Sequence, residues 1–395
     1  MALKKQFLKR LEITICCRFV RSVVQYVVSE REAEIASKIR TIEPKTEVIV
    51  MRNNVEITEA RPLLDLHGDL AQVGFARKLL PIYDKSRVKG GLMRLKEWDY
   101  YYVGNEHYGV ALTIADNSYM GLDSFSFLMF DGEPWEITKS PMRWLTMGKT
   151  NLPESSDEGV SEIYGKHYYL KFVVGNGQRH LTGHIEKFQA NHDLTVDITL
   201  KSEPEESMVI CTPFNKAGHF YFNQKINCMP AEGFVKLGGQ KYEFKPEDSM
   251  GLLDWGRGVW TYHNTWYWGS ASGRIDGADF GFNIGYGFGD TSAATENMLF
   301  YNGKSHKLSE VYFNIPMKNG TEDYLAPWTF TSDDGKFEMD FVPIIDRASC
   351  TDVKLIKSDQ HQVFGKFTGQ ATLEDGTVIE IHDFIGFAEK VENKW

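Results

Sequence analysis

Residues 254–269 combine ionisable side chains with a high density of tryptophan, in the order Asp-Trp-Gly-Arg-Gly-Val-Trp-Thr-Tyr-His-Asn-Thr-Trp-Tyr-Trp-Gly. Trp266 and Trp268 are two residues apart, so an extended strand points both to one face and Tyr267 to the other. If that face lines a barrel interior, it forms a deep aromatic wall. An aromatic environment disfavours an ionised carboxylate. We therefore expect Asp254 to stay protonated near neutral pH and to donate a proton to an alkene or a carbonyl.

The neighbouring side chains suggest how such a proton transfer would be supported. Trp266 and Trp268 would stabilise a developing cation, an interaction of roughly 0.5–2 kcal/mol, while Arg257 and Asn283 would orient the ligand. A structural alternative stays open, because Asp254 and Arg257 could form an ion pair at a strand end and the tryptophans could fill a core. The residues that we expect to line the ligand site are Trp255, Trp260, Tyr262, His263, Trp266, Trp268, Asn283 and Tyr286.

Other patterns argue against common cofactor and metal sites. Residues 280–290 are rich in glycine but lack the Gly-Lys-Ser/Thr ending of a phosphate-binding loop, so a nucleotide is not indicated. His180 and His184 would lie about 13 Å apart along a strand, too far to share a metal ion. The sequence also has no Gly-x-Ser-x-Gly motif. We therefore expect neither a metal nor an organic cofactor.

The elements that carry these residues read as short strands joined by tight turns. Residues 194–200 alternate apolar and polar side chains, as a half-buried strand does, and residues 233–244 read as a hairpin. Few segments after residue 60 show helical periodicity. The pattern predicts an all-β protein, either a barrel or a sandwich. The turn dipeptides begin at Asp131, Asn176, Gly238, Asp276, Asn302, Asn319, Asp334 and Asp375.

Composition limits the partners and the compartment. The chain has 395 residues, 42% of them hydrophobic, which favours two domains. Its net charge is −10, and no cluster of Lys and Arg follows residue 50, so nucleic acid is an unexpected partner. The five cysteines are irregularly spaced, which favours a reducing compartment and a cytoplasmic location. The sequence does not indicate an oligomeric state.

The first fifty residues differ from the remainder. They carry ten Lys and Arg against six Asp and Glu, and we expect a partly helical or disordered extension. Residues 13–28 are too short and too charged to cross a membrane, so no integral membrane association is predicted. Synthesis starting at Met51 and an organelle-targeting role are both open hypotheses. We place the first β-barrel half at residues 51–230 and the second at residues 231–395.

Five motifs are distinctive: residues 61–65, 96–101, 223–228, 253–258 and 285–290. Together they resemble the family known as domain of unknown function 2804, over residues 56–395. More distantly, a hairpin followed by Asp–aromatic–Gly, Trp-x-Trp and an Asp-Gly turn is similar to the second barrel of tandem lipocalin-like proteins such as carotenoid 1,2-hydratases, tocopherol cyclases and pericyclases. The resemblance implies two tandem lipocalin-like (calycin) antiparallel β-barrels and a carboxylate proton donor, for which Asp254 is the matching position. The related motif usually reads Asp-His, whereas Trp255 follows Asp254 here.

Three functions follow as hypotheses. The first is an enzyme that encloses a small hydrophobic, isoprenoid-like molecule and catalyses acid-assisted hydration, cyclisation or isomerisation without a redox cofactor. The second is a carrier that uses the same cavity without chemistry. The third is a carbohydrate-binding or carbohydrate-processing β-protein. A closed apolar pocket around Asp254 would favour the first two, and an open groove with exposed tryptophans would favour the third.

Overall fold

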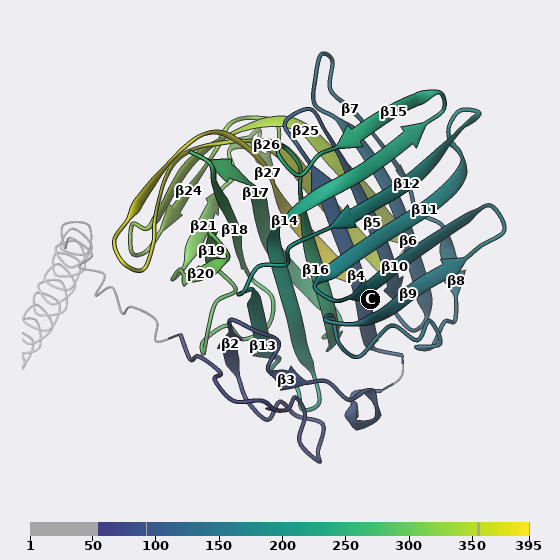
Figure 1. Ribbon diagram of the computed structural model, residues 1–395. Helices are drawn as coiled ribbons and strands as arrows, with labels where there is room; N and C mark the ends of the chain where they lie inside the picture. Colours follow the sequence, from purple (N-terminus) through teal and green to yellow (C-terminus); the bar gives the residue numbers. More distant parts are fainter. Residues whose placement is uncertain (1–53, 92, 354–355, 395) are drawn as a thin grey trace, which may run out of the picture. The chain divides into compact units, whose positions relative to one another are not determined.

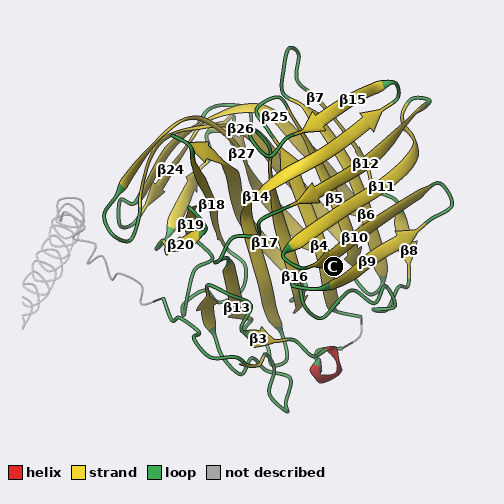
Figure 2. Cartoon of the chain, in the orientation of Figure 1, coloured by secondary structure: helices red, strands yellow, loops and turns green. Residues whose placement is uncertain are grey.

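The computed structural model describes residues 54–91, 93–353 and 356–394. The expected N-terminal extension, residues 1–50, lies outside the described residues. Within the described ranges the chain is all-β apart from one short 3-10 turn, η1 (Lys85–Arg87), which confirms the predicted absence of long helices (Figures 1 and 2).

Two antiparallel sheets contain most of the described residues. Along its main path the larger sheet runs β7 (Trp135–Lys139), β6 (Met120–Met129), β5 (Tyr108–Asp116), β4 (Leu95–Gly104), β16 (Met250–Val259), β14 (Phe220–Leu237), β12 (His192–Leu200), β11 (Gln178–Gln189), β10 (Tyr168–Gly175) and β9 (Gly159–Tyr164). Four further strands attach to it: β2 (Gly74–Ala76), β8 (Met142–Trp144), β13 (Met208–Pro213) and β15 (Gln240–Phe244).

The smaller sheet curls into a half-barrel. Its order is β20 (Lys304–Lys307), β19 (Met298–Tyr301), β18 (Ala278–Tyr286), β17 (His263–Ile275), β27 (Val378–Lys394), β26 (Ile356–Thr372), β25 (Phe337–Val353), β24 (Trp328–Ser332) and β21 (Val311–Asn314). Two short pairs complete the described strands: β1 (Arg61–Pro62) with β3 (Pro81–Ile82), and β22 (Met317–Lys318) with β23 (Thr321–Glu322).

Local sequence explains these strands and turns. The apolar residues at positions 194, 196, 198 and 200 of β12 are buried, while the positions between them are not, as the alternation predicts. At the turn between β17 and β18, Asp276 and Gly277 have φ values of 51° and 82°, the left-handed conformation that a tight hairpin requires. The predicted hairpin at residues 233–244 forms between β14 and β15.

Each sheet packs a solid core on one of its faces. The larger sheet buries Tyr101, Phe172 and Trp255 among many aliphatic side chains. The smaller sheet buries Phe282 and Phe367 in a core dominated by phenylalanine. Neither core leaves the hollow barrel interior that we expect from the sequence, because bulky aromatic side chains fill both.

The other faces of the two sheets pack against each other (Figure 1). Two further apolar clusters occupy the layer between them, one around Tyr221 and Trp260 and the other around Tyr102 and Phe387. Trp266 and Trp268 belong to this layer and Tyr267 to the core of the smaller sheet. The prediction that the two tryptophans share a face is therefore confirmed, but that face meets the larger sheet instead of lining a barrel interior.

The chain leaves the larger sheet after Val259 and enters the smaller one at His263. This crossing comes later than the division after residue 230 that we expect from the sequence, a position that falls inside β14. Gly256 is needed just before the crossing, because it lies opposite Trp98 and any Cβ there would overlap the Trp98 ring. The glycine of the Asp-Trp-Gly motif thus makes room for the Trp98 ring of β4 to pack against the backbone of β16.

Candidate functional site

Strand β16 places Asp254 and Arg257 on opposite faces of the larger sheet, since their positions differ by three, an odd number. Arg257 is fully buried in the core of that sheet, where it forms an ion pair with Asp99 at 3.1 Å. Its guanidinium also donates to the carbonyl oxygens of Trp98 and Pro153 at 2.9 and 2.8 Å. The ion pair between Asp254 and Arg257 that the structural alternative predicts is wrong, because the two side chains lie on opposite faces of the sheet and have other partners.

Asp254 instead faces the smaller sheet and pairs with Lys225. The two residues lie directly opposite each other on β16 and β14, and the Lys225 Nζ is 2.9 Å from the Asp254 Oδ1. The side-chain amide of Asn223 donates a second hydrogen bond to the same oxygen at 2.6 Å. Because both neighbours are donors, the carboxylate form of Asp254 fits these contacts. The carboxyl oxygen that we expect to face a ligand is therefore in contact with two groups of the protein itself.

Trp268 closes the other side of this ion pair. The ammonium of Lys225 lies 3.9 Å from the centroid of the Trp268 ring, which is a cation–π contact. The Trp268 indole N–H donates to the Asn283 Oδ1 at 2.7 Å, and the Asn283 amide donates to the Glu296 carbonyl at 2.9 Å. The Trp268 face that we expect to stabilise a ligand cation is therefore occupied by Lys225.

Glu389, on β27 directly beside Trp268, completes the group. Its two carboxylate oxygens accept hydrogen bonds from the Trp266 indole N–H at 2.9 Å and the Gln362 amide at 3.0 Å. Burial raises the pKa of Glu389 to about 7, against the lowering effect of the Trp266 hydrogen bond. We call Asn223, Lys225, Asp254, Asn283 and Glu389 the buried polar cluster. Within this buried polar cluster, Glu389 is the residue whose pKa is raised to near neutral pH.

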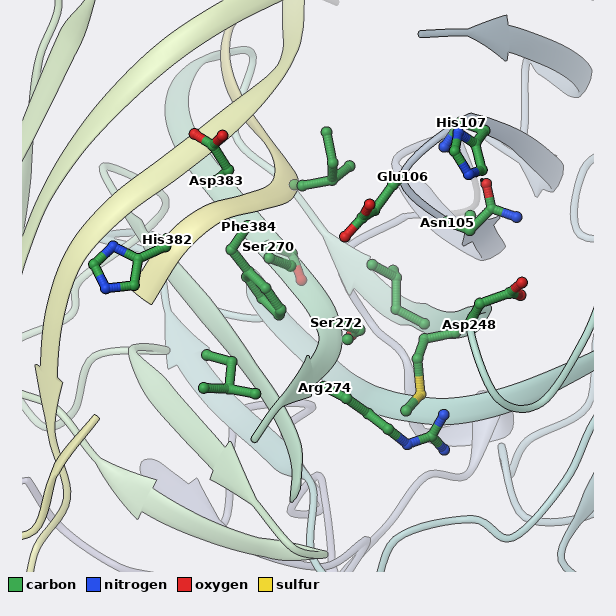
Figure 3. Close-up of a pocket in the computed structure, with 18 of the residues that line it drawn as sticks. Asn105, Glu106, His107, Asp248, Ser270, Ser272, Arg274, His382, Asp383 and Phe384 are labelled. Carbon is green, nitrogen blue, oxygen red and sulfur yellow. Dashed lines mark hydrogen bonds between the residues drawn. The ribbon is translucent and has the colours of Figure 1, made fainter. Parts of the chain in front are cut away.

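A pocket of about 750 Å³ opens between the sheets beside this cluster (Figure 3). Its walls come from the β4–β5 turn, the start of β16, the end of β17 and residues 382–386 of β27. Its inner wall is apolar, with Tyr102, Leu252 and Phe384, and its mouth is polar. A pocket of this size suits a small organic molecule.

The inner wall of the pocket is continuous with the buried polar cluster. The rings of Trp268 and Tyr100 cover the cluster; they pack edge-on with centroids 5.8 Å apart, and Tyr100 lies opposite Asp254. Three residues of the wall each lie two positions along a strand from Asp254 or from one of these two rings, on the same strand face and about 7 Å away at the usual rise per residue. These pairs are Leu252 and Asp254, Tyr102 and Tyr100, and Ser270 and Trp268.

Phe387 lies between the pocket and Glu389. It is opposite Ser270, is fully buried, and packs against Trp268 with ring centroids 4.8 Å apart. A ligand in the pocket must displace this ring to touch Glu389. Trp266, on the far side of Glu389, keeps part of its ring exposed, and the Asp254 side chain is 12% exposed.

None of the site residues predicted from the sequence lines this pocket, and those not yet described lie away from the buried polar cluster as well. Trp255 packs in the core of the larger sheet against Phe222. Tyr286 stacks on Tyr267 in the core of the smaller sheet, with ring centroids 4.4 Å apart. The others are Trp260, which packs edge-on against Trp98, Trp266 and Phe288, and Tyr262 and His263, which are exposed near the start of β17.

Sequence reasoning missed Lys225, Glu389 and Gln362. Lys225 lies within one of the family motifs, and Glu389 is one of several charged residues near the end of the chain. Neither stands near another acid or base in a recognisable spacing. Only the pairing of β14 with β16 and of β17 with β27 brings them together.

In the ranges that the structure describes, no three His, Cys, Asp or Glu side chains are close enough to hold a metal ion. Within the same ranges, no helix has the length and apolar character of a membrane span.

The fold and the site define an all-β protein that combines two facing antiparallel sheets with a pocket of small-molecule size. The chain belongs to the DUF2804 family, "Domain of unknown function (DUF2804)", which matches residues 54–395. No curated protein matches the sequence.

Several solved structures show distant similarity. A putative AttH from Nitrosomonas europaea is 11% identical, with 75% of this chain and 92% of that chain covered and a TM-score of 0.44. Kievitone hydratase from Nectria haematococca is 12% identical, with 85% and 98% covered and a TM-score of 0.45. CghA in complex with Sch210972 is 10% identical, with 87% and 97% covered and a TM-score of 0.43.

Proposed function

We propose that this protein binds a small organic molecule in the pocket between its two sheets and that Glu389 exchanges a proton with it. In this proposal the two sheets are tandem lipocalin-like halves, and the ligand lies between them instead of inside either barrel. The observation that carries the proposal is the position of Glu389, a buried carboxyl group with a pKa of about 7 behind the apolar inner wall of the pocket.

The chemistry follows from this protonation state. At neutral pH about half of the Glu389 side chains carry a proton, so the group can act as both acid and base. Proton transfer to an alkene or carbonyl leaves positive charge on the ligand, and the ring of Phe387, which lies between the pocket and Glu389, is placed to stabilise that charge. The opposite charges of Lys225 and Asp254 compensate each other, and the cation–π contact of Lys225 holds the Trp268 ring in place. Hydration, cyclisation or isomerisation of an unsaturated compound fits these groups.

A non-catalytic carrier is the second candidate. Both oxygens of Glu389 already accept hydrogen bonds from the protein, and Phe387 covers the carboxyl group from the pocket side. The same pocket would then hold a ligand without a reaction. A carbohydrate-binding groove has less support, because among the described tryptophans only Trp144, on β8, is strongly exposed.

Two variants separate binding from chemistry. We would incubate the protein with a cell extract and compare bound and converted compounds by mass spectrometry. Ile385→Trp, which fills the pocket, should abolish binding, and Glu389→Gln should keep binding but stop conversion. If the Ile385→Trp variant still binds the compound, the compound does not bind in this pocket and the proposal is wrong. Equal conversion by wild type and Glu389→Gln would exclude Glu389 as the proton donor. Binding by wild type without any conversion would leave the carrier.

A further inference from the structure

We propose that the occupant of this pocket is a protonated amine with an apolar body, and that the pocket mouth rejects carboxylates and phosphates. This inference rests on the proposed function, because it names the ligand class for the same pocket. Two independent observations carry it: the charges at the mouth and an unpartnered hydroxyl group on the inner wall.

The pocket mouth is strongly acidic. Arg274 is the single Lys or Arg side chain among the lining residues, and Asp279 already pairs with it at 2.9 Å. Figure 3 shows Glu106 reaching over the pocket from the β4–β5 turn and Asp383 across from it, while Asp248 lies farther out with its carboxylate pointing away from Glu106. The six lining carboxylates are Glu106, Glu247, Asp248, Asp276, Glu380 and Asp383.

Most of these carboxylates have no cationic partner. Asp383 pairs with Lys366 at 3.5 Å. Among the described residues, no Lys or Arg forms an ion pair with Glu106, Asp248 or Glu380. The local potential at the mouth is therefore negative, which attracts cations and repels anions.

Tyr102 supplies the second observation. Its side chain lines the inner wall and is 7% exposed, and its hydroxyl group has no hydrogen-bond partner. The ring lies over Gly104, which also lines the pocket, and a side chain at that position would collide with the hydroxyl. Burial raises the pKa of the Tyr102 phenol, so it stays protonated. Since buried hydroxyls are nearly always paired, this group marks a place where a polar atom of the ligand belongs.

The two observations together define the ligand. Leu252 and Phe384 beside Tyr102 provide apolar surface for the body of the molecule. The carboxylates at the pocket mouth then face the outer end of the ligand, where a positively charged group would lie. A protonated amine satisfies them, whereas a fatty acid or an isoprenoid phosphate would place like charges together.

Three indole compounds with the same aromatic body test the charge preference by isothermal titration calorimetry at low salt and pH 7: tryptamine, tryptophol and indole-3-acetate. Tryptamine should bind about tenfold tighter than tryptophol, and indole-3-acetate should bind most weakly. The double variant Glu106→Gln/Asp248→Asn should bring tryptamine close to tryptophol without changing the affinity for tryptophol. Glu133→Gln, at an exposed turn outside the pocket, is the matched control and should leave all three affinities unchanged.

The outcomes separate this inference from the proposed function. If tryptophol or indole-3-acetate binds as tightly as tryptamine, the inferred preference for an amine is wrong. If Ile385→Trp also abolishes that binding, the pocket still binds small molecules, as the proposed function states, but without selecting for a positive charge. Unchanged tryptamine binding in Ile385→Trp would overturn the inference, because the amine would then bind elsewhere. Absence of binding by all three compounds would overturn it as well.

Discussion

Lys225 and Asp254 lie directly opposite each other on neighbouring antiparallel strands, and their charged groups meet at 2.9 Å between the two sheets. The lysine side chain is 4% exposed and the aspartate side chain 12%. Lys225 also contacts the Trp268 ring of the smaller sheet. One buried ion pair thus connects the larger sheet to the tryptophan strand of the smaller one.

Asp254→Asn should destabilise the protein by about 3 kcal/mol, because it removes the carboxylate that pairs with the buried Lys225 ammonium at 2.9 Å. Urea denaturation measures the change. The double variant Lys225→Met/Asp254→Leu should recover most of the loss. As a control, Lys201→Met breaks an exposed ion pair with Glu232 and should cost less than about 1 kcal/mol. An Asp254→Asn protein as stable as wild type would show that the pair contributes nothing.

Glu389 should make stability depend on pH. Its pKa in the folded protein is about 7, above the ordinary value of 4.5. The folded state therefore holds an extra proton between these pH values, and this group's contribution to stability falls as pH rises from about 4.5 to about 7. The full loss is about 3 kcal/mol for a shift of this size.

Glu389→Gln should remove that dependence. Gln362 can turn its amide to present its unpartnered oxygen to the new side chain, so the hydrogen bonds persist. The stability difference between variant and wild type, from urea midpoints at pH 5 and pH 8, should favour the variant more at pH 8. A difference that stays constant between the two pH values would contradict the raised pKa.

Arg257→Lys should destabilise the protein by about 3 kcal/mol without altering ligand affinity in the folded fraction. A lysine cannot reproduce the separate bonds of the guanidinium to Asp99, Trp98 and Pro153. Denaturation and calorimetry on the same sample measure both effects. Arg61→Lys, at an exposed site, is the control. Lost affinity at unchanged stability would restore a ligand-contacting role for Arg257.

The sequence alone predicts the strands well, because their signals are local. Alternation at residues 194–200 and the Asp276-Gly277 turn each depend on a few neighbouring residues. The shared face of Trp266 and Trp268 is confirmed for the same reason. What that face would meet could not be predicted, because it depends on how a second sheet packs against β17.

The candidate site was predicted only in part. Asp254, Trp266, Trp268 and Asn283 do lie together in the layer between the sheets. Glu389 is more than one hundred residues away in the sequence and becomes their neighbour through the pairing of β17 with β27. A three-residue spacing suggested that Arg257 would join Asp254, but strand geometry sends it to the opposite face.

The side-chain amide of Asn227, on β14, donates to the Ser270 and Ser272 hydroxyls of β17 at 2.8 and 3.1 Å and to the Phe282 carbonyl of β18 at 3.2 Å. Both serines also line the pocket. One residue of the larger sheet therefore clamps two strands of the smaller sheet at the pocket floor. These hydrogen bonds fix the distance between the two pocket walls before a ligand binds. The pocket should therefore discriminate between closely related compounds by their width.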